Sequence, residues 1–165
     1  MKQNNRKEIT FHLSELTEKY INPKNDPRIY YAKEVTFDYA SDHAGRVDYI
    51  QFKPLNNSVS GIEKGDFLCF EIKSSEEDFH SKHGHNFIGD FNYYVMPSEL
   101  YEKIHKEIPW DIGVFTAGPD ATYLINQKRA HRRNRKHSVS EMLLMMFRSA
   151  NRENIKNKRK EYPDV

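Results

Sequence analysis

The chain has 165 residues, a length typical of a single domain, and its net charge is only +2 although 30% of its residues are charged. It shows no signal peptide and no apolar stretch long enough to span a bilayer, which argues against a secreted or membrane protein. The single Cys69 cannot form an internal disulfide, and we expect a soluble protein of the reducing cytoplasm.

The N-terminal part predicts a helix followed by a strand. Apolar residues recur at nearly helical spacing across residues 9–21, and Pro23 ends this pattern. Residues 30–39 then alternate imperfectly and predict a first strand around 33–37, which contains Glu34. A solvated surface carboxylate is the ordinary interpretation of this residue.

A second strand carries an acidic residue that could reach the third. Residues 45–52 are rich in β-formers and contain Asp48 near their start. The loop that follows, residues 53–66, holds several Pro, Gly and Asn residues typical of turns. A hairpin across this loop could set Asp48 beside Glu71 on the next strand.

The third strand, residues 67–74, is apolar apart from an internal charged pair. Glu71 and Lys73 are two positions apart, so in a strand their side chains point to the same face. Burying both is costly unless each has a partner, and a metal ion and a phosphate would serve. Together with Asp48 they suit a hard cation, Mg²⁺ first among them. A salt-bridged strand end would also explain the pair.

The next segment predicts a helix, a strand, a helix and a strand. Ser74 or Ser75 could cap a helix running toward residue 88, and a strand follows at 92–96. Ser98 is expected to cap the second helix, before a last strand at 111–118. We therefore predict an α/β fold with a mixed sheet flanked by helices.

A group of histidines lies after the third strand. His80, His83 and His85 could form a zinc site, but no Cys pair or second His group completes one, so solvated or phosphate-facing side chains are favoured. Lys82 could contact a nucleic-acid backbone. Asp90 is expected to cap or pair rather than to bind metal.

The composition becomes basic after residue 118. An apolar helical stretch at 142–147, with Ser140 as its expected cap, is too short to span a membrane and should pack on the sheet. A solvated tail and a phosphate-binding surface are both open interpretations of the basic residues before it. These residues are Lys128, Arg129, Arg132, Arg133, Arg135 and Lys136.

Residues of roughly 34–118 resemble the PD-(D/E)xK nuclease superfamily, and within it the MmcB-like DNA-repair branch. The resemblance rests on Asp48, on the Glu-Ile-Lys-Ser-Ser run at 71–75, on Asp78-Phe79 and on the strand from Asp90 to Pro97. The chain departs from the superfamily pattern at Val47, where a proline is usual. The resemblance implies a restriction-endonuclease-like αβββαβ core, about residues 9–118, followed by a basic helical segment, 119–165, in one domain.

The resemblance also implies roles for individual residues. Asp48, Glu71 and the main-chain carbonyl of Ile72 would hold Mg²⁺ or Mn²⁺, and Lys73 would position the attacking water or stabilise the transition state. Glu34 would be a further metal ligand or the base that orients this water. Other branches take that acid from the first helix, where Glu15 or Glu18 would serve.

The expected function is therefore metal-dependent hydrolysis of phosphodiester bonds, in DNA rather than RNA, in repair or in mobile-element or phage nucleic-acid processing. No membrane partner is expected, and a homodimer is possible. The alternative is a catalytically inactive nucleic-acid-binding adaptor on a nuclease-like fold, because a fold does not guarantee an activity.

Overall fold

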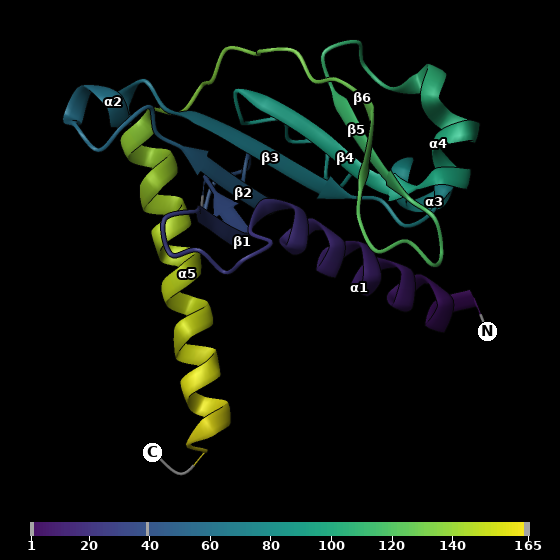
Figure 1. The fold of residues 1–165 in the computed structure, drawn as a ribbon, viewed down its shortest axis with the longest axis horizontal. Helices are drawn as coiled ribbons and strands as arrows, with labels where there is room; N and C mark the ends of the chain where they lie inside the picture. The colour runs from purple at the N-terminus through teal and green to yellow at the C-terminus, as the bar shows by residue number, and fades with distance from the viewer. Residues whose placement is uncertain (1, 39, 164–165) are drawn as a thin grey trace.

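The protein is built on one mixed β-sheet, seen in the computed structural model, which describes residues 2–38 and 40–163 (Figure 1). The first three strands are antiparallel, β3, β4 and β5 are parallel, and β6 returns antiparallel to β5. In spatial order the strands are β1 (Tyr30–Phe37), β2 (Gly45–Lys53), β3 (Asp66–Ile72), β4 (Phe91–Pro97), β5 (Gly113–Ala117) and β6 (Ile125–Lys128). This confirms the predicted mixed α/β sheet.

Five α-helices accompany the sheet in the described residues. The long ones stand at the two ends of the chain, and a 3₁₀ turn at His105–Glu107 follows the fourth. They are α1 (Lys2–Ile21), α2 (Val59–Glu63), α3 (Glu76–Phe79), α4 (Ser98–Ile104) and α5 (Val139–Glu161). None of these described helices is long and apolar enough to cross a membrane.

Several predicted boundaries differ from the observed ones. Helix α1 begins seven residues earlier than the apolar pattern at 9–21, because its first turns are polar. The helix expected to reach residue 88 is a single turn capped by Ser75, and Gly84 beyond it has a φ of +70° that a right-handed helix cannot contain. Helix α5 is capped by Ser138, which forms a capping box with Glu141, and not by Ser140.

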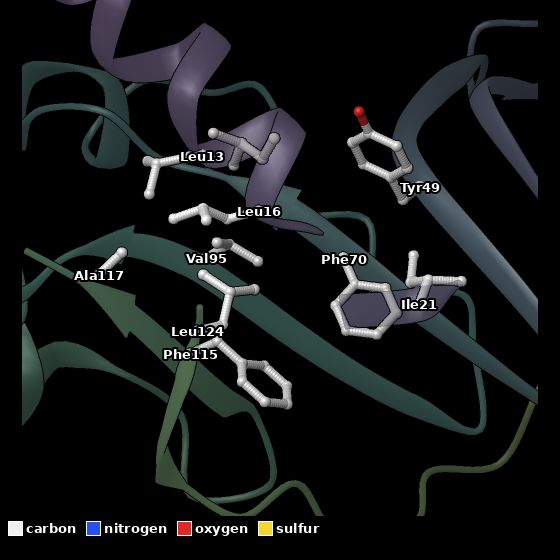
Figure 2. Packing of buried hydrophobic residues seen from close by; sticks show 10 residues of the cluster. Leu13, Leu16, Ile21, Tyr49, Phe70, Val95, Phe115, Ala117 and Leu124 are labelled. Atoms are coloured by element: carbon white, nitrogen blue, oxygen red, sulfur yellow. The ribbon is translucent and has the colours of Figure 1, made fainter. Parts of the chain in front are cut away.

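One face of the sheet is covered by α1 (Figure 2). Leu13 and Leu16, three positions apart on the helix, pack in one buried cluster with Phe70 of β3, Val95 of β4 and Phe115 of β5. Each such buried side chain stabilises the fold by roughly 1.5–3 kcal/mol. This cluster fixes α1 against the centre of the sheet.

The opposite face is covered by α5 at one side and α4 at the other. Met142 and Met146 of α5 pack against the β1–β3 strands, while Leu100 and Ile104 of α4 pack on β4 and β5. The apolar stretch at 142–147 therefore packs on the sheet as predicted. Strand β6 was not predicted, because Asn126 and Gln127 break any apolar alternation, and the sheet extends beyond residue 118.

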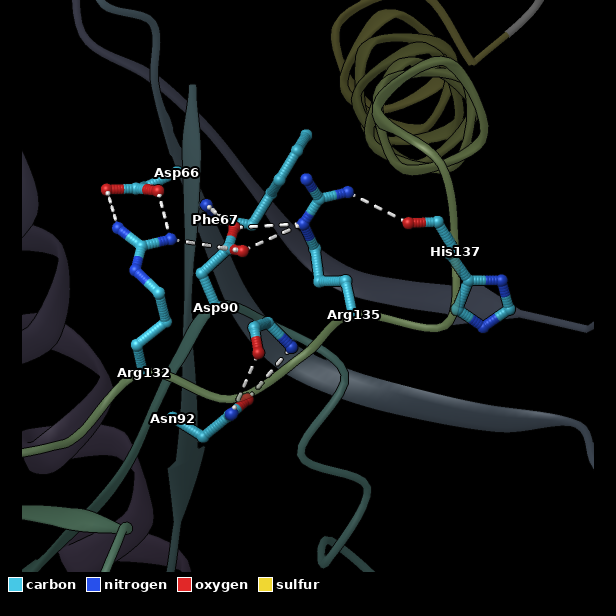
Figure 3. A network of polar contacts seen from close by, with 8 residues as sticks. Asp66, Phe67, Asp90, Asn92, Arg132, Arg135 and His137 are labelled. Carbon is cyan, nitrogen blue, oxygen red and sulfur yellow. Dashed lines mark hydrogen bonds and ion pairs between the residues drawn. The ribbon is translucent and has the colours of Figure 1, made fainter. Parts of the chain in front are cut away.

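An arginine segment, residues 129–138, connects β6 to α5 through a polar network (Figure 3). The buried carboxylate of Asp90 accepts hydrogen bonds from the backbone N–H of Phe67 at 2.8 Å and from Arg135 Nε at 2.9 Å. Arg132 forms a two-bonded ion pair with Asp66, and Arg133 pairs with Asp111 at 2.8 Å. Their guanidinium groups, and that of Arg135, also lie over phenylalanine rings.

Candidate active site

A cleft of about 850 Å³ opens at the end of the sheet where β3 ends. Its walls come from α1, from the β1–β2 hairpin, from the loop at 80–86 and from Glu153 of α5. Asp48, Glu71 and Ile72 lie along it, so residues from two neighbouring strands meet in one hollow.

Strands β1 and β2 share an irregularity that faces the cleft. Ala32 and Val35 both pack on the α5 side of the sheet although they are three residues apart, and so do Val47 and Ile50 on β2. The strict two-residue alternation of side chains is therefore interrupted in both strands. The interruption falls at Glu34, whose φ is +48°, and at Asp48.

The carboxylate of Asp48 reaches across to the end of β3. Its Oδ2 accepts a hydrogen bond from the backbone N–H of Ile72 at 2.8 Å. This contact places it next to Glu71, which is only 4% exposed. Burial, with the charge of Asp48, raises the pKa of Glu71 to about 8, and burial also raises the pKa of Asp48.

The ammonium group of Lys73 is enclosed by the loop that follows α3. Its Nζ donates hydrogen bonds to the main-chain carbonyls of His83, at 2.5 Å, and of Asp78, at 3.4 Å. Burial lowers the pKa of Lys73. Gly84 makes this enclosure possible, since a Cβ there would lie 2.7 Å from Lys73 Nζ and 3.2 Å from Glu71 Oε2.

Asn86 connects the same loop to both strands of the site. Its Nδ2 donates to Glu71 Oε1 at 3.3 Å and to the main-chain carbonyl of Arg46 at 2.9 Å. The loop at 80–86 thus holds Glu71 through Asn86 and Lys73 through His83. The predicted set of Asp48, Glu71 and Lys73 is brought together at one end of the sheet.

The remaining sequence-predicted acids have separate places. Glu34 lines the cleft and lies 3.6 Å from Arg46, between its Oε1 and the guanidinium Nη1. Glu18 forms an ion pair with Lys33 and accepts a hydrogen bond from the hydroxyl of Tyr49, and Glu15 is exposed outside the cleft. Of these three acids, Glu34 is the one that lines the cleft.

The three histidines do not converge. His80 pairs with Glu107, and the ring of His85 contacts the hydroxyl of Tyr94 and the carbonyl of Ser81. His83 instead lines the cleft. Within residues 2–38 and 40–163, no three His, Cys, Asp or Glu side chains form a group that could hold a metal ion.

Most of the basic residues predicted to bind nucleic acid lie elsewhere. Lys82 lines the cleft, but none of the six basic residues at 128–136 does. Arg132, Arg133 and Arg135 are held in the ion pairs with Asp66, Asp111 and Asp90, so their first role is to fix the arginine segment. The sequence did not indicate these acidic partners, which lie 22 to 66 positions away in the chain, and the phosphate-binding interpretation of the run stays a prediction.

Sequence reasoning missed the basic side chains that do line the cleft. Arg6 of α1 pairs with Asp78 at 3.0 Å, and Arg46 of β2 is exposed at the rim. Arg46 could have been found, because it stands two positions before Asp48 on the same strand. Arg6 could not, since nothing in the sequence indicates which side of α1 faces the cleft.

The donors present fit a hard divalent cation. Asp48 and Glu71 are two close, poorly solvated carboxyl groups, and burial, followed by the charge of Asp48, raises the pKa of Glu71. Mg²⁺ is commonly held by one or two carboxylates with water completing its shell. A cation bound here would stabilise both carboxylates in their charged form, whereas without a cation a proton on Glu71 removes one of the two charges.

The fold and the cleft together define an α/β protein with a charged centre at one end of a mixed sheet. No known family profile and no curated protein matches the chain. A solved structure with a similar fold is a protein of unknown function from Silicibacter pomeroyi, with 15% sequence identity, coverage of 90% of both chains and a TM-score of 0.58. At this identity the likeness shows the fold alone.

Proposed function

We propose that the protein is a metal-dependent nuclease that hydrolyses phosphodiester bonds, with DNA as the preferred nucleic acid. The observation that carries this proposal is that Asp48 of β2 and Glu71 of β3 line one cleft, while the ammonium group of Lys73 lies beside Glu71, enclosed by the loop at 80–86. Two carboxylates beside an ammonium group supply both a cation site and a positive charge for a phosphate.

Asp48 and Glu71 would hold Mg²⁺ or Mn²⁺, with the main-chain carbonyl of Ile72 as a third donor. When bound, the ion would polarise a phosphate and lower the pKa of a water molecule. Lys73, enclosed by the loop at 80–86, would orient that water or stabilise negative charge that builds up on the phosphate.

Glu34 would act from the rim of the cleft as a base that orients the water rather than as a ligand. Its place opposite Arg46 keeps its carboxylate within the cleft. Lys82 and Arg46, both exposed at the rim, would contact phosphates of the bound strand. The free thiol of Cys69 is buried, which suits the reducing cytoplasm where we place the protein.

The test is cleavage of a panel of labelled substrates, single strand, duplex, flap, four-way junction and RNA, with Mg²⁺ or Mn²⁺. Asp48→Ala and Lys73→Ala should each lose about 100-fold or more of the activity, the typical effect of removing a group that stabilises the transition state. Lys73→Met is the second lysine variant, because it removes a buried charge while keeping most of the volume.

Glu63→Gln and Lys103→Ala serve as matched controls, since both residues are exposed on helices outside the cleft. Equal cleavage by the wild-type protein and the folded Asp48 and Lys73 variants would reject this centre. Binding of nucleic acid that needs no divalent ion and leads to no cleavage would instead identify the protein as a nucleic-acid-binding adaptor.

A further inference from the structure

The depth of the centre limits what kind of nucleic acid can reach it. Glu71, which lines a cleft walled by α1, the loop at 80–86 and α5, is only 4% exposed, and Lys73, enclosed beside it by the same loop, is 2% exposed. Duplex DNA is stiff over about 150 base pairs and resists being bent into a hollow. A single strand, which rotates freely about its backbone bonds, can bring one phosphate down to the bottom of the cleft.

One wall of this cleft continues along α1 into an adjoining hollow. Arg6, Thr10 and Ser14 follow one another at single helical turns and line both hollows. The adjoining hollow is completed by Lys7 and Phe11. A chain leaving the cleft over α1 therefore meets these two side chains next.

Phe11 is a large apolar residue that lies outside the buried clusters of the described residues. Its side chain is 64% exposed, whereas Leu13 and Leu16 of the same helix are buried against the sheet (Figure 2). An exposed aromatic residue alone is ordinary. Here it lies four residues after Lys7, on the neighbouring helical turn, and Ser14 next to it reaches the candidate active site.

Aromatic rings and basic groups combined along a groove are how proteins bind single strands without reading sequence. Every base has a face that stacks on such a ring, and a lysine one turn away can contact the adjacent phosphate. Base pairs in a duplex are already stacked on each other and would not offer a face to Phe11.

We propose that the substrate class is single-stranded nucleic acid, and that Phe11 stacks a base of the strand as it leaves the cleft while Lys7 contacts a phosphate. This inference rests on the proposed function for the identity of the cleft. It makes Phe11 and Lys7 binding residues that select single strands over duplex.

The test is binding of fluorescent oligonucleotides to the full chain in EDTA, measured by anisotropy, so that cleavage plays no part. Phe11→Ala should weaken single-strand binding at least about fivefold, the lower end of the effect of losing one base stack. Phe11→Tyr should restore it, and duplex binding should stay unchanged. Lys7→Ala should reduce the slope of log affinity against log salt by about 0.7.

Two variants are matched controls that should bind as the wild-type protein does. Phe147→Ala removes a ring of similar exposure, 69%, from α5, and Lys103→Ala removes an exposed lysine from α4. The inference would be overturned if Phe11→Ala bound single strands as well as the wild-type protein does. It would also be overturned if the wild-type protein bound duplex more tightly than single strands. Phe11-dependent binding without cleavage in Mg²⁺ would uphold it while refuting the nuclease.

Discussion

The carboxylate of Asp48 on β2 accepts a hydrogen bond from the backbone N–H of Ile72, the last residue of β3, at 2.8 Å. This bond ties the two strands together and keeps the carboxylate of Asp48 beside the carboxyl group of Glu71. Both carboxyl groups have raised pKa values, and the pKa of Glu71 reaches about 8. Burial is the main cause for both groups and the charge of Asp48 adds to the shift of Glu71, so a proton or a cation would stabilise this poorly solvated pair.

The first prediction concerns stability against pH. The folded protein keeps a proton on Glu71 up to a pKa of about 8, whereas the unfolded chain loses it near 4.5. Between these values the folded state binds more protons, so its free energy of unfolding falls as pH rises, by an amount on the order of a few kcal/mol. Chemical denaturation across this range measures it. Glu71→Gln should flatten the curve, and a wild-type stability that rises with pH would contradict the prediction.

The second prediction concerns divalent ions in the absence of nucleic acid. Mg²⁺ or Mn²⁺ should raise the thermal midpoint, and more so above pH 8 than at pH 6, because protons compete with the cation for Glu71. At 100 times its dissociation constant, a ligand that binds only the folded state adds about 2.7 kcal/mol. Asp48→Asn should lose the shift and Glu63→Gln, exposed on α2, should keep it. A shift that survives Asp48→Asn places the ion elsewhere.

The third prediction separates two ion pairs of the arginine segment (Figure 3). Asp90→Ala should lower the free energy of unfolding by about 3–5 kcal/mol, because it leaves Arg135, 16% exposed at its side chain, without its partner. Asp66→Ala removes the partner of Arg132, 56% exposed at its side chain, and should cost about 1 kcal/mol or less. Urea denaturation compares the two, and equal losses would refute this account.

Contacts between residues that lie close together in the chain could be predicted from the sequence, whereas contacts between distant residues could not. Glu71 and Lys73 could be placed on one face from a two-residue spacing, and Asp48 beside them from a hairpin. The partners of Arg132 and Arg135 could not be found, since Asp66 and Asp90 lie 66 and 45 residues away. For the same reason the sequence could not show that the basic run also contains the ion pairs that fix the segment before α5.

The fourth prediction uses two glycines as a matched pair. Gly84→Ala adds a Cβ that would lie 2.7 Å from Lys73 Nζ at a φ of +70°, so it should cost about 1–2 kcal/mol and displace the lysine. Gly118→Ala meets nothing within 4 Å and should be nearly neutral. Denaturation measures the stabilities, and a cleavage assay should show a loss for Gly84→Ala alone. Full activity in a folded Gly84→Ala protein would show that the enclosure of Lys73 is not needed.

The last prediction tests why Glu34 occupies an unfavourable backbone conformation. Its φ of +48° costs a residue with a Cβ about 1–2 kcal/mol. Arg152 of α5 donates to its main-chain carbonyl at 2.7 Å, and Ser149 donates to the carbonyl of Lys33 and, at 3.4 Å, to that of Glu34, so the helix holds this segment in place.

Glu34→Gly and Glu34→Ala both remove the carboxylate, but glycine accepts this φ without strain. Glu34→Gly should therefore be more stable than Glu34→Ala by about 1 kcal/mol in urea denaturation, while both lose cleavage activity to the same degree. Equal stabilities would show that the strain is absent. Unchanged cleavage in both variants would show that the strained conformation serves the shape of the cleft, not the chemistry of a carboxylate.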